Sequence, residues 1–557
     1  MKMNTKRREI IILIIMAFVT SVICLIPQIN NGLFVGDDIF AHSLRVQSLY
    51  NGFKAGQGYP LYIYQEAMEG YGYAFGLFYP DLFLLPAVLF KFLGFSTDTS
   101  MKLLVFIIMV ITCLVTYAVS KYISNSRFAA SVSMVLYCLG HYHLTDVIRR
   151  FALGEVIAMI FVPLVFMGLY DLTEKGYKKK GILLIAFTGL LLSHTISFVL
   201  CAILSFVWLI IRIKNMIKTP KLIAGVAIEA VICIFITSYY WMPVIEQFMD
   251  SKFRVNVKHR FLTQNFTQSI SDIVSGIHSV AFIEIGILCL LVFWGAYKKM
   301  VSRKSILLLI CTVALIVLQT DLFPWRLIDK TVFVSIQFPW RINIFTELFL
   351  ALGIGIQSDL LISHYKAQKR IQIIAIAVCL AVGIVNVFTI WKVEMADYIG
   401  YIDYPDTYLE NDFLTCVVGQ CEWLPEEGDI NDIEFGETKY VLYEYGVLEG
   451  QKNKDGSYSF SPNGIAGKYI VPKYYYKGYT AMYIDSAGIR HELDVEKNKD
   501  VGWTEVNLTG DETKVTVYYA GTAVQRYSLL ITILSLCGMV VFGIVNVRKR
   551  RLSSEIC

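Results

Sequence analysis

The first polar segment of the chain places two carboxylates, an imidazole and a guanidinium at helical spacing. Asp37 and Asp38 are adjacent, and His42 and Arg45 follow them. If a helix begins near Asp38, positions 38, 42 and 45 share one face. The positive end of the helix dipole keeps carboxylates there ionised, so one of them is a candidate general base. His42 could carry a proton and Arg45 could bind an anion. An N-capped amphipathic surface helix would show the same pattern.

A second polar segment, residues 141–155, adds two arginines and two carboxylates. Arg149 and Arg150 are predicted to lie on the outer side of the membrane, against the usual preference of basic residues for the cytoplasmic side. Arginine clamps phosphate oxygens with two parallel hydrogen bonds, which favours an anion-binding role for both. Asp146 and Glu155 are candidate supporting residues. The alternative is that both arginines only extend to the membrane interface.

Two further features are predicted to lie on the same side. The tetrapeptide Phe-Pro-Trp-Arg occurs twice, ending at Arg326 and at Arg341. His194 follows an apolar run and is a further supporting residue. Transfer from a lipid phosphate would need such a set, because a carboxylate removes the proton of an acceptor hydroxyl and arginines stabilise the departing phosphate. Arg45, Arg149, Arg150 and Arg341 are the predicted phosphate-binding residues.

The amino-acid composition indicates that these residues belong to a membrane protein. Of the 557 residues, 56% are hydrophobic and 17% are charged, compared with roughly 25% charged in soluble domains. Apolar runs long enough to cross a bilayer recur along the chain, which excludes a soluble globule. The formal charge of +5 comes from short basic clusters beside these runs. That arrangement predicts the lipid bilayer as a partner and excludes nucleic acid.

The basic clusters predict about twelve transmembrane helices with both termini in the cytoplasm. Counting the apolar stretch Leu77–Leu93 as a span would invert every later loop, so it is predicted to be interfacial or re-entrant, as its prolines suggest. Alternating strands separated by Gly, Asn and Asp turns predict an extracytoplasmic β-sandwich near the C-terminus. The predicted organisation is therefore a transmembrane core over 1–391 with an outer loop at 28–100, the sandwich at 392–526, and a last helix with a basic tail at 527–557.

Cofactor and cysteine chemistry leave alternatives open. Asp37, Asp38 and Asp146 could supply oxygen ligands to a divalent cation, although no spacing rule fixes such a site. No metal site is therefore assigned. Cys416 and Cys421 lie in a polar segment and could form a short-loop disulfide on an oxidising exterior.

In these motifs the chain resembles the bacterial membrane glycosyltransferases of the GT-C superfamily, in particular YfhO-like and 6-pyruvoyl-tetrahydropterin synthase-related membrane proteins. The resemblance covers most of the chain. Besides the motifs above it includes Gly70 to Tyr73, Phe78 to Asp81, Ser193-His194 and Gln337 to Arg341. It implies a GT-C-like bundle in the bacterial plasma membrane and a polyprenyl-phosphate-linked sugar donor. It also implies a surface polymer or lipid as acceptor, and a catalytic role for Asp37 or Asp38.

Two other functions are compatible with the same sequence. A lipid or polysaccharide transporter would normally place polar sites near the bilayer midplane and often show an inverted repeat. A non-catalytic protein for envelope assembly would work through its C-proximal β domain, and Asp37 and Asp38 would then be dispensable.

Overall fold

The computed structural model describes residues 5–29, 33–34, 36–214, 219–257, 262–271, 282–395, 401–402, 421–429, 431, 433, 439–485 and 487–555. The chain forms two compact units. Unit 1 consists of Met1–Ile39, Phe95–Val226 and His259–Tyr404, and unit 2 of Phe40–Gly94, Ala227–Lys258 and Pro405–Cys557. Each unit therefore combines segments that are distant in sequence. The predicted domains were continuous segments of the chain, whereas each of these units combines three separate segments.

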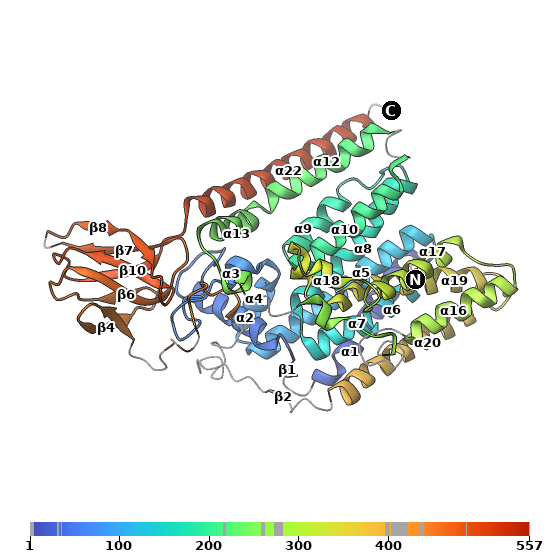
Figure 1. Ribbon diagram of the computed structural model, residues 1–557. Helices are drawn as coiled ribbons and strands as arrows, with labels where there is room; N and C mark the ends of the chain where they lie inside the picture. The colour runs from blue at the N-terminus through green and yellow to red at the C-terminus, as the bar shows by residue number, and fades with distance from the viewer. Residues whose placement is uncertain are drawn as a thin grey trace. The chain divides into compact units, whose positions relative to one another are not determined.

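Unit 1 is a helical bundle (Figure 1). Its helices are α1 (Thr5–Leu25), α5 (Thr97–Ser124), α6 (Arg127–Cys138), α7 (His141–Leu144), α8 (Leu153–Glu174), α9 (Ile182–Leu191), α10 (Thr195–Ile211), α16 (Phe282–Tyr297), α17 (Arg303–Leu318), α18 (Trp325–Ile328), α19 (Asn343–Ile362) and α20 (Gln368–Thr389). The shorter helical turns are η1 (Ile26–Gln28), η3 (Thr145–Arg150), η4 (Thr263–Phe266), η5 (Val332–Ile336), η6 (Pro339–Ile342) and η7 (Ile390–Glu394). Two short strands, β1 (Leu33–Phe34) and β2 (Tyr401–Ile402), pair antiparallel.

Serine caps start two of these helices. The Ser96 side chain accepts a hydrogen bond from the Thr99 amide before α5, and the Ser126 side chain accepts one from Ala129 before α6. Such caps satisfy backbone donors that have no partner inside the helix. Helix α19 packs against α6, α16 and α17, and it is buried along most of its length.

Among the described residues the long apolar runs are helical, but not every helix is long enough to cross a bilayer by itself. In the described part of the chain, six helices have the length and composition of a membrane span. A seventh span results if α12 and α13, which meet at an angle of 68°, are counted together. Several predicted spans, such as α9 and α16, belong to a group of shorter apolar helices of 10–17 residues. The chain is thus a multi-helix membrane protein. Helix length and composition support six or seven spans and do not establish the predicted number of about twelve.

Unit 2 joins helices to a sheet. Its helices are α2 (Ile39–Lys54), α3 (Phe75–Phe78), α4 (Leu85–Phe92), α12 (Pro220–Ile236), α13 (Ser238–Asp250), α14 (Arg254–Val257) and α22 (Ala523–Glu555), with the short turn η2 (Leu82–Leu84). Helix α2 begins one residue after Asp38, as predicted. The stretch Leu77–Leu93 is divided among α3, η2 and α4 and forms no continuous span. The prediction that this stretch is not a single spanning helix agrees with these breaks.

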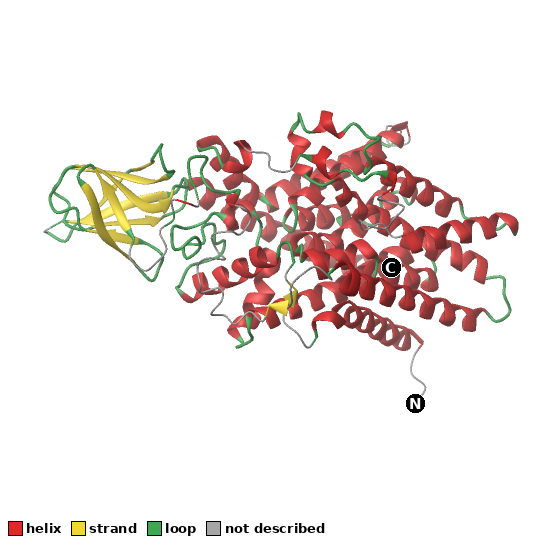
Figure 2. Ribbon diagram, turned by 60° about the horizontal axis from the view of Figure 1, so that its bottom comes forward, coloured by secondary structure: helices red, strands yellow, loops and turns green. Residues whose placement is uncertain are grey.

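The C-proximal β domain is one nine-stranded sheet in the order β8-β7-β11-β5-β4-β3-β6-β10-β9. The strands are β3 (Tyr440–Tyr443), β4 (Gly446–Lys452), β5 (Tyr458–Phe460), β6 (Gly467–Tyr474), β7 (Tyr479–Ile484), β8 (Arg490–Leu493), β9 (Val495–Lys497), β10 (Trp503–Leu508) and β11 (Val515–Tyr519). The first half of β4 pairs with β3 and its second half with β5. The sheet therefore curls over at β4 into a barrel-like body (Figure 2). The predicted β domain is confirmed, but as one continuous sheet in place of two packed ones.

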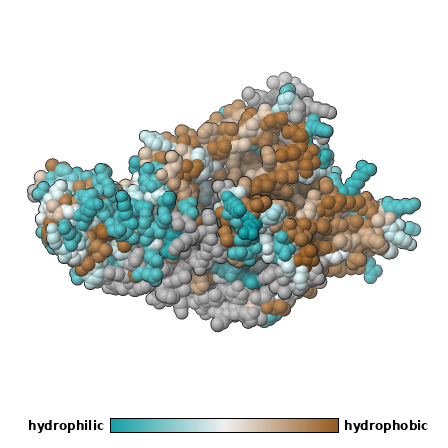
Figure 3. All heavy atoms as spheres, viewed as in Figure 1, coloured by the Kyte–Doolittle hydropathy of each residue, from teal (hydrophilic) through white to brown (hydrophobic). Residues whose placement is uncertain are grey.

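The helices and the β-sheet differ in the hydropathy of their surfaces. On the face shown in Figure 3, hydrophobic side chains dominate much of the helical surface, whereas hydrophilic side chains dominate the sheet. On α22 the exposed residues are largely apolar, including Leu534, Val541 and Phe542. Because contiguous apolar surface of this kind is unfavourable in water, these helices are suited to lipid. Cys416 lies outside the described residues, and the predicted Cys416–Cys421 disulfide does too.

Within unit 2 the sheet packs on the Gly70 to Tyr73 motif. The Tyr71 ring is fully buried and lies between the rings of Tyr474 and Trp503, with centroids 5.8 and 5.0 Å away. The Tyr474 amide donates to the Tyr71 carbonyl at 3.0 Å. The buried Lys473 ammonium donates to the Gly70 carbonyl at 2.6 Å. The Gly70 to Tyr73 motif therefore attaches the β-sheet to the segment that follows α2.

Replacing Tyr71 with alanine should destabilise unit 2 by about 3–5 kcal/mol, because it leaves a cavity between two aromatic rings. In a domain of this size that loss lowers the midpoint of thermal unfolding by roughly 10 °C. The measurement is thermal unfolding of the purified full chain in nanodiscs. Tyr445→Ala is the matched control, since Tyr445 is 69% exposed and its ring should contribute little. Equal midpoints for the two variants would contradict the anchoring role.

Candidate active site

The turn that carries the acidic pair rests on the backbone of the arginine pair. The Asp38 amide donates to the Arg150 carbonyl at 2.8 Å. A Cβ atom at position 36 would collide with the carbonyl oxygen of Arg149, so only glycine allows this approach. All these residues belong to unit 1. The two motifs singled out in the sequence therefore meet directly.

A π-helical turn positions Arg150. Turn η3 lies between α7 and α8, and it ends at Phe151, whose φ of 53° is left-handed. Single turns of this type occur often at functional sites, since they redirect side chains within a helix. The Arg150 guanidinium donates to the buried Asp146 carboxylate within this turn. Asp146 therefore orients Arg150.

Glu155, in the first turn of α8, connects the cluster. Its Oε1 accepts a hydrogen bond of 2.6 Å from the Tyr142 hydroxyl. Its Oε2 accepts one of 3.3 Å from Nη1 of Arg150 and lies 3.7 Å from Nε of Arg341. Glu155 is 2% exposed. One carboxylate therefore holds two guanidinium groups in a site with little water, where their charge acts strongly.

Arg341 reaches this cluster from η6. Its Nη1 donates to the Ile336 carbonyl at 2.8 Å and to the Gln337 side chain at 3.1 Å. The guanidinium also lies over the Phe338 ring, 4.9 Å from its centroid. Among the described residues, Nε of Arg341 and Oδ2 of Asp146 are buried without a hydrogen-bond partner. The hydrogen bonds of Arg341 use Nη1, and its Nε–H remains available as a donor. This arrangement suits Arg341 to bind an anion.

The two Phe-Pro-Trp-Arg copies differ in their surroundings. Arg326, which ends the first copy, is exposed. Arg341, which ends the second, is 7% exposed. The repeat therefore contributes one arginine to the cluster.

Asp38 and Asp37 also differ. Asp38 is half-buried, whereas Asp37 is exposed. Burial raises the pKa of Asp38, and the charges of Arg150 and Arg341 oppose that rise. Both guanidinium groups therefore lie close enough to Asp38 to act on its charge. The structure therefore brings Asp38, one of the predicted catalytic pair, close to Arg150 and Arg341.

His194 is buried beside the same charges. Its Nδ1 is 2.8 Å from the Ser197 hydroxyl and accepts the Ser197 amide at the start of α10. Burial lowers the pKa of His194 to about 3. The imidazole is therefore neutral near pH 7 and supports the site as a helix cap, adding no positive charge.

His42 and Arg45 belong to unit 2 and form a different cluster. The Arg45 guanidinium is 1% exposed and donates to Asp81 Oδ1 through Nε at 2.9 Å and Nη2 at 2.6 Å. It also donates to the Pro80 carbonyl, and Nδ1 of His42 lies 3.1 Å from its Nη1. The Tyr64 hydroxyl donates to the other Asp81 oxygen at 2.5 Å.

This internal ion pair replaces the predicted role of Arg45 in phosphate binding. The pair holds α2 to the Phe78 to Asp81 motif, which explains the polar residues of that motif. The sequence places Arg45 on the same helical face as His42, which the structure confirms, but it contains no signal that Asp81 would neutralise the arginine.

The residues that sequence reasoning missed are Tyr142 and Gln337. Both contact the charged residues of the cluster through side-chain hydrogen bonds. Each has a weak signal in the sequence, because Tyr142 lies between two histidines and Gln337 precedes the second Phe-Pro-Trp-Arg copy. Gln337 also has a φ of 63°, and such strained backbone is concentrated at functional sites.

The carboxylates of this cluster do not fit a divalent cation. Asp146 and Glu155 are already paired with Arg150, whose charge repels a metal ion. Within the described ranges, no three His, Cys, Asp or Glu side chains are grouped as metal ligands.

A family model described as a family of unknown function (DUF6541) matches residues 11–326, which is more than half of the chain. The chain belongs to this family. The matched residues include Asp38, Arg150 and Glu155, so most of the cluster lies inside the DUF6541 region. Arg341 lies beyond it. A search of curated proteins gives no match.

Proposed function

We propose that this DUF6541 chain is an integral membrane glycosyltransferase of GT-C type. It transfers a sugar from a polyprenyl-phosphate donor to a surface polymer or lipid on the outer face of the bacterial plasma membrane. In this proposal the chain crosses the membrane about twelve times with both termini in the cytoplasm. The observation that carries the proposal is a half-buried carboxylate, Asp38, within the electrostatic influence of the buried arginines Arg150 and Arg341.

The reaction assigns separate roles to these groups. Asp38 removes the proton from the acceptor hydroxyl, and the acceptor oxygen forms a bond to the anomeric carbon of the sugar. The bond from that carbon to the phosphate oxygen breaks, and its electron pair leaves with the polyprenyl phosphate. Arg341 and Arg150 stabilise the negative charge that develops on the phosphate. The proton on Asp38 passes to solvent after the product leaves.

Glu155, Asp146 and Tyr142 are positioning residues. Their hydrogen bonds and ion pairs hold the two guanidinium groups before the donor binds. Such preorganisation means that the charges need not rearrange while the reaction proceeds.

The direct test uses purified chain in nanodiscs with a panel of radiolabelled polyprenyl-phosphate sugars and a membrane extract as the acceptor source. We expect at least one donor to be consumed, with free polyprenyl phosphate and labelled acceptor formed together. Movement of intact donor across the bilayer of sealed vesicles that contain the chain, without cleavage, would support a transporter. No consumption of any donor would contradict the enzyme proposal.

The pH dependence of transfer should follow Asp38. Only the ionised carboxylate accepts a proton, and burial raises its pKa, so the rate should fall with decreasing pH at a midpoint above the ordinary aspartate value of about 3.9. Below the midpoint the rate falls about tenfold per pH unit. Arg341→Gln should move this midpoint to higher pH, because the arginine charge lowers the pKa of Asp38. His194→Asn is the control and should leave the midpoint in place. An unmoved midpoint in Arg341→Gln would contradict the assignment.

A further inference from the structure

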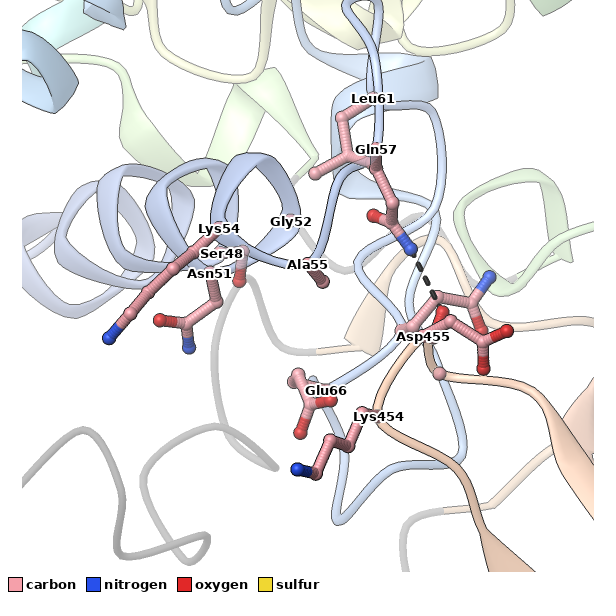
Figure 4. Close-up of a pocket in the computed structure, with 12 residues that line it drawn as sticks. Ser48, Asn51, Gly52, Lys54, Ala55, Gln57, Leu61, Glu66, Lys454 and Asp455 are labelled. Atoms are coloured by element: carbon pink, nitrogen blue, oxygen red, sulfur yellow. Dashed lines mark hydrogen bonds between the residues drawn. The ribbon is translucent and has the colours of Figure 1, made fainter.

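Unit 2 contains a pocket of about 250 Å³, and the residues that line it include none of the proposed reaction centre. One wall is the end of α2, with Ser48 and Asn51, and a second is the loop that carries Gln57, Gln65 and Glu66. The turn between β4 and β5, with Lys454 and Asp455, forms the third wall (Figure 4). The Gln57 amide donates to the Asp455 carbonyl at 3.0 Å and joins two of these walls.

A buried lysine sets the orientation of Gln65. The side-chain oxygen of Gln65 accepts from the Tyr479 hydroxyl at 3.2 Å and lies 3.4 Å from Nζ of Lys473. Lys473 is fully buried, and burial lowers its pKa to about 7. These two donors use the amide oxygen of Gln65, so its NH₂ group is the part of the side chain that can donate to a ligand.

The side-chain amides of Asn51 and Gln57 each use one of their two polar groups in a hydrogen bond within the protein. The Asn51 oxygen accepts from the Gln47 amide at 3.0 Å, which leaves the Asn51 NH₂ group as a donor. Gln57 uses its NH₂ group to bind Asp455 and keeps its oxygen as an acceptor. The pocket therefore offers donors and an acceptor in fixed positions, and sugar hydroxyls both donate and accept.

Four charged side chains line the pocket and carry no net charge, and the nearby Lys452 adds one positive charge. Lys54 and Lys454 line it together with Glu66 and Asp455. Glu66 pairs with Lys452 at 2.5 Å. Hydrogen bonds from Ser457 lower the pKa of Asp455, which stays ionised. The polar groups that a ligand would meet in defined positions are therefore mainly the amides, which bind uncharged hydroxyls.

We propose that this pocket binds a neutral glycan and is the acceptor-binding site of the chain. The inference rests on the proposed function, because a transferase of this type needs an acceptor with free hydroxyls. The amides of Asn51, Gln57 and Gln65 bind the hydroxyls, and the bound sugar ring lies between α2 and the β4–β5 turn. The volume is below the roughly 300–1,000 Å³ of drug-sized sites, which suits one sugar ring of a longer chain.

The test is binding of the full-length chain in nanodiscs to an array of neutral and acidic bacterial glycans. We expect neutral glycans to be retained, and Asn51→Leu with Gln57→Leu to reduce their signal at least tenfold. Asn507→Leu is the matched control, since Asn507 is exposed on β10 outside the pocket. Thermal unfolding of each variant separates lost binding from lost folding.

Each outcome has a defined meaning. Binding of acidic glycans alone, binding of no glycan, or equal loss in the Asn507→Leu control would overturn the pocket proposal. Glycan binding without any donor consumption would keep the pocket and overturn the transferase. Donor consumption with unchanged rates in the pocket variants would do the reverse.

Discussion

Replacing Asp38 with asparagine should lower the rate of sugar transfer by about 10²–10⁴-fold, the usual contribution of a general base. Asparagine keeps the size and the backbone hydrogen bond to Arg150, so the turn should remain folded. The rate is measured as release of free polyprenyl phosphate from labelled donor by the chain in nanodiscs. Because the variant also removes a negative charge that interacts with Arg150 and Arg341, the affinity for the anionic donor should not fall, and the loss should appear in kcat.

Asp37→Asn is the matched control for this prediction. The adjacent carboxylate is exposed, and we expect less than a tenfold loss when it is replaced. Wild-type rates in both single variants and in the double variant would refute catalysis by this pair. A larger loss in Asp37→Asn than in Asp38→Asn would transfer the role of base to Asp37.

The second large effect concerns stability. Arg45→Met should destabilise unit 2 by about 3–5 kcal/mol, because it leaves the Asp81 carboxylate buried without its cation. Burial already raises the pKa of Asp81, and the Arg45 charge opposes that rise. Thermal unfolding in nanodiscs should show a lower midpoint. Adding Asp81→Asn to Arg45→Met should restore part of the loss, since no charge then remains buried.

Two comparisons separate this structural role from phosphate binding. Arg490→Met changes an arginine whose side chain is 51% exposed and should alter stability by less than about 0.5 kcal/mol. If Arg45 instead bound the donor, Arg45→Met would raise KM for the donor and leave the unfolding midpoint unchanged. That result would return Arg45 to the reaction centre.

Local patterns were sufficient for several features of the fold. The start of α2 after Asp38, the interruption of Leu77–Leu93 and the β-rich C-proximal domain all follow from spacing, proline positions and alternation. These signals lie within a few residues of one another, so they need no knowledge of the tertiary structure. Helix length was less predictable, because an apolar run records hydrophobicity and not where a helix breaks.

The sequence was sufficient to predict which types of residue form the candidate site. It predicted only in part which individual residues belong to it. Asp38, Arg150, Glu155 and Arg341 were all candidates, and the structure places them in one unit. Arg45 was indistinguishable from them in sequence, because its partner Asp81 is 36 residues away. Tyr142 was missed because a tyrosine between histidines in an apolar chain is ordinary until its hydroxyl is seen to donate to Glu155.

By itself, the sequence determined that this chain is a membrane protein with a β domain near its C-terminus and clustered polar motifs, since composition and periodicity are local properties. Only the tertiary structure decided which charges meet. Gly36 allows the acidic turn to rest on the Arg149 carbonyl, and Glu155 gathers arginines separated by nearly 200 positions. The same folding pairs Arg45 with Asp81. Such pairings depend on burial, where an unpaired charge is too unfavourable to persist.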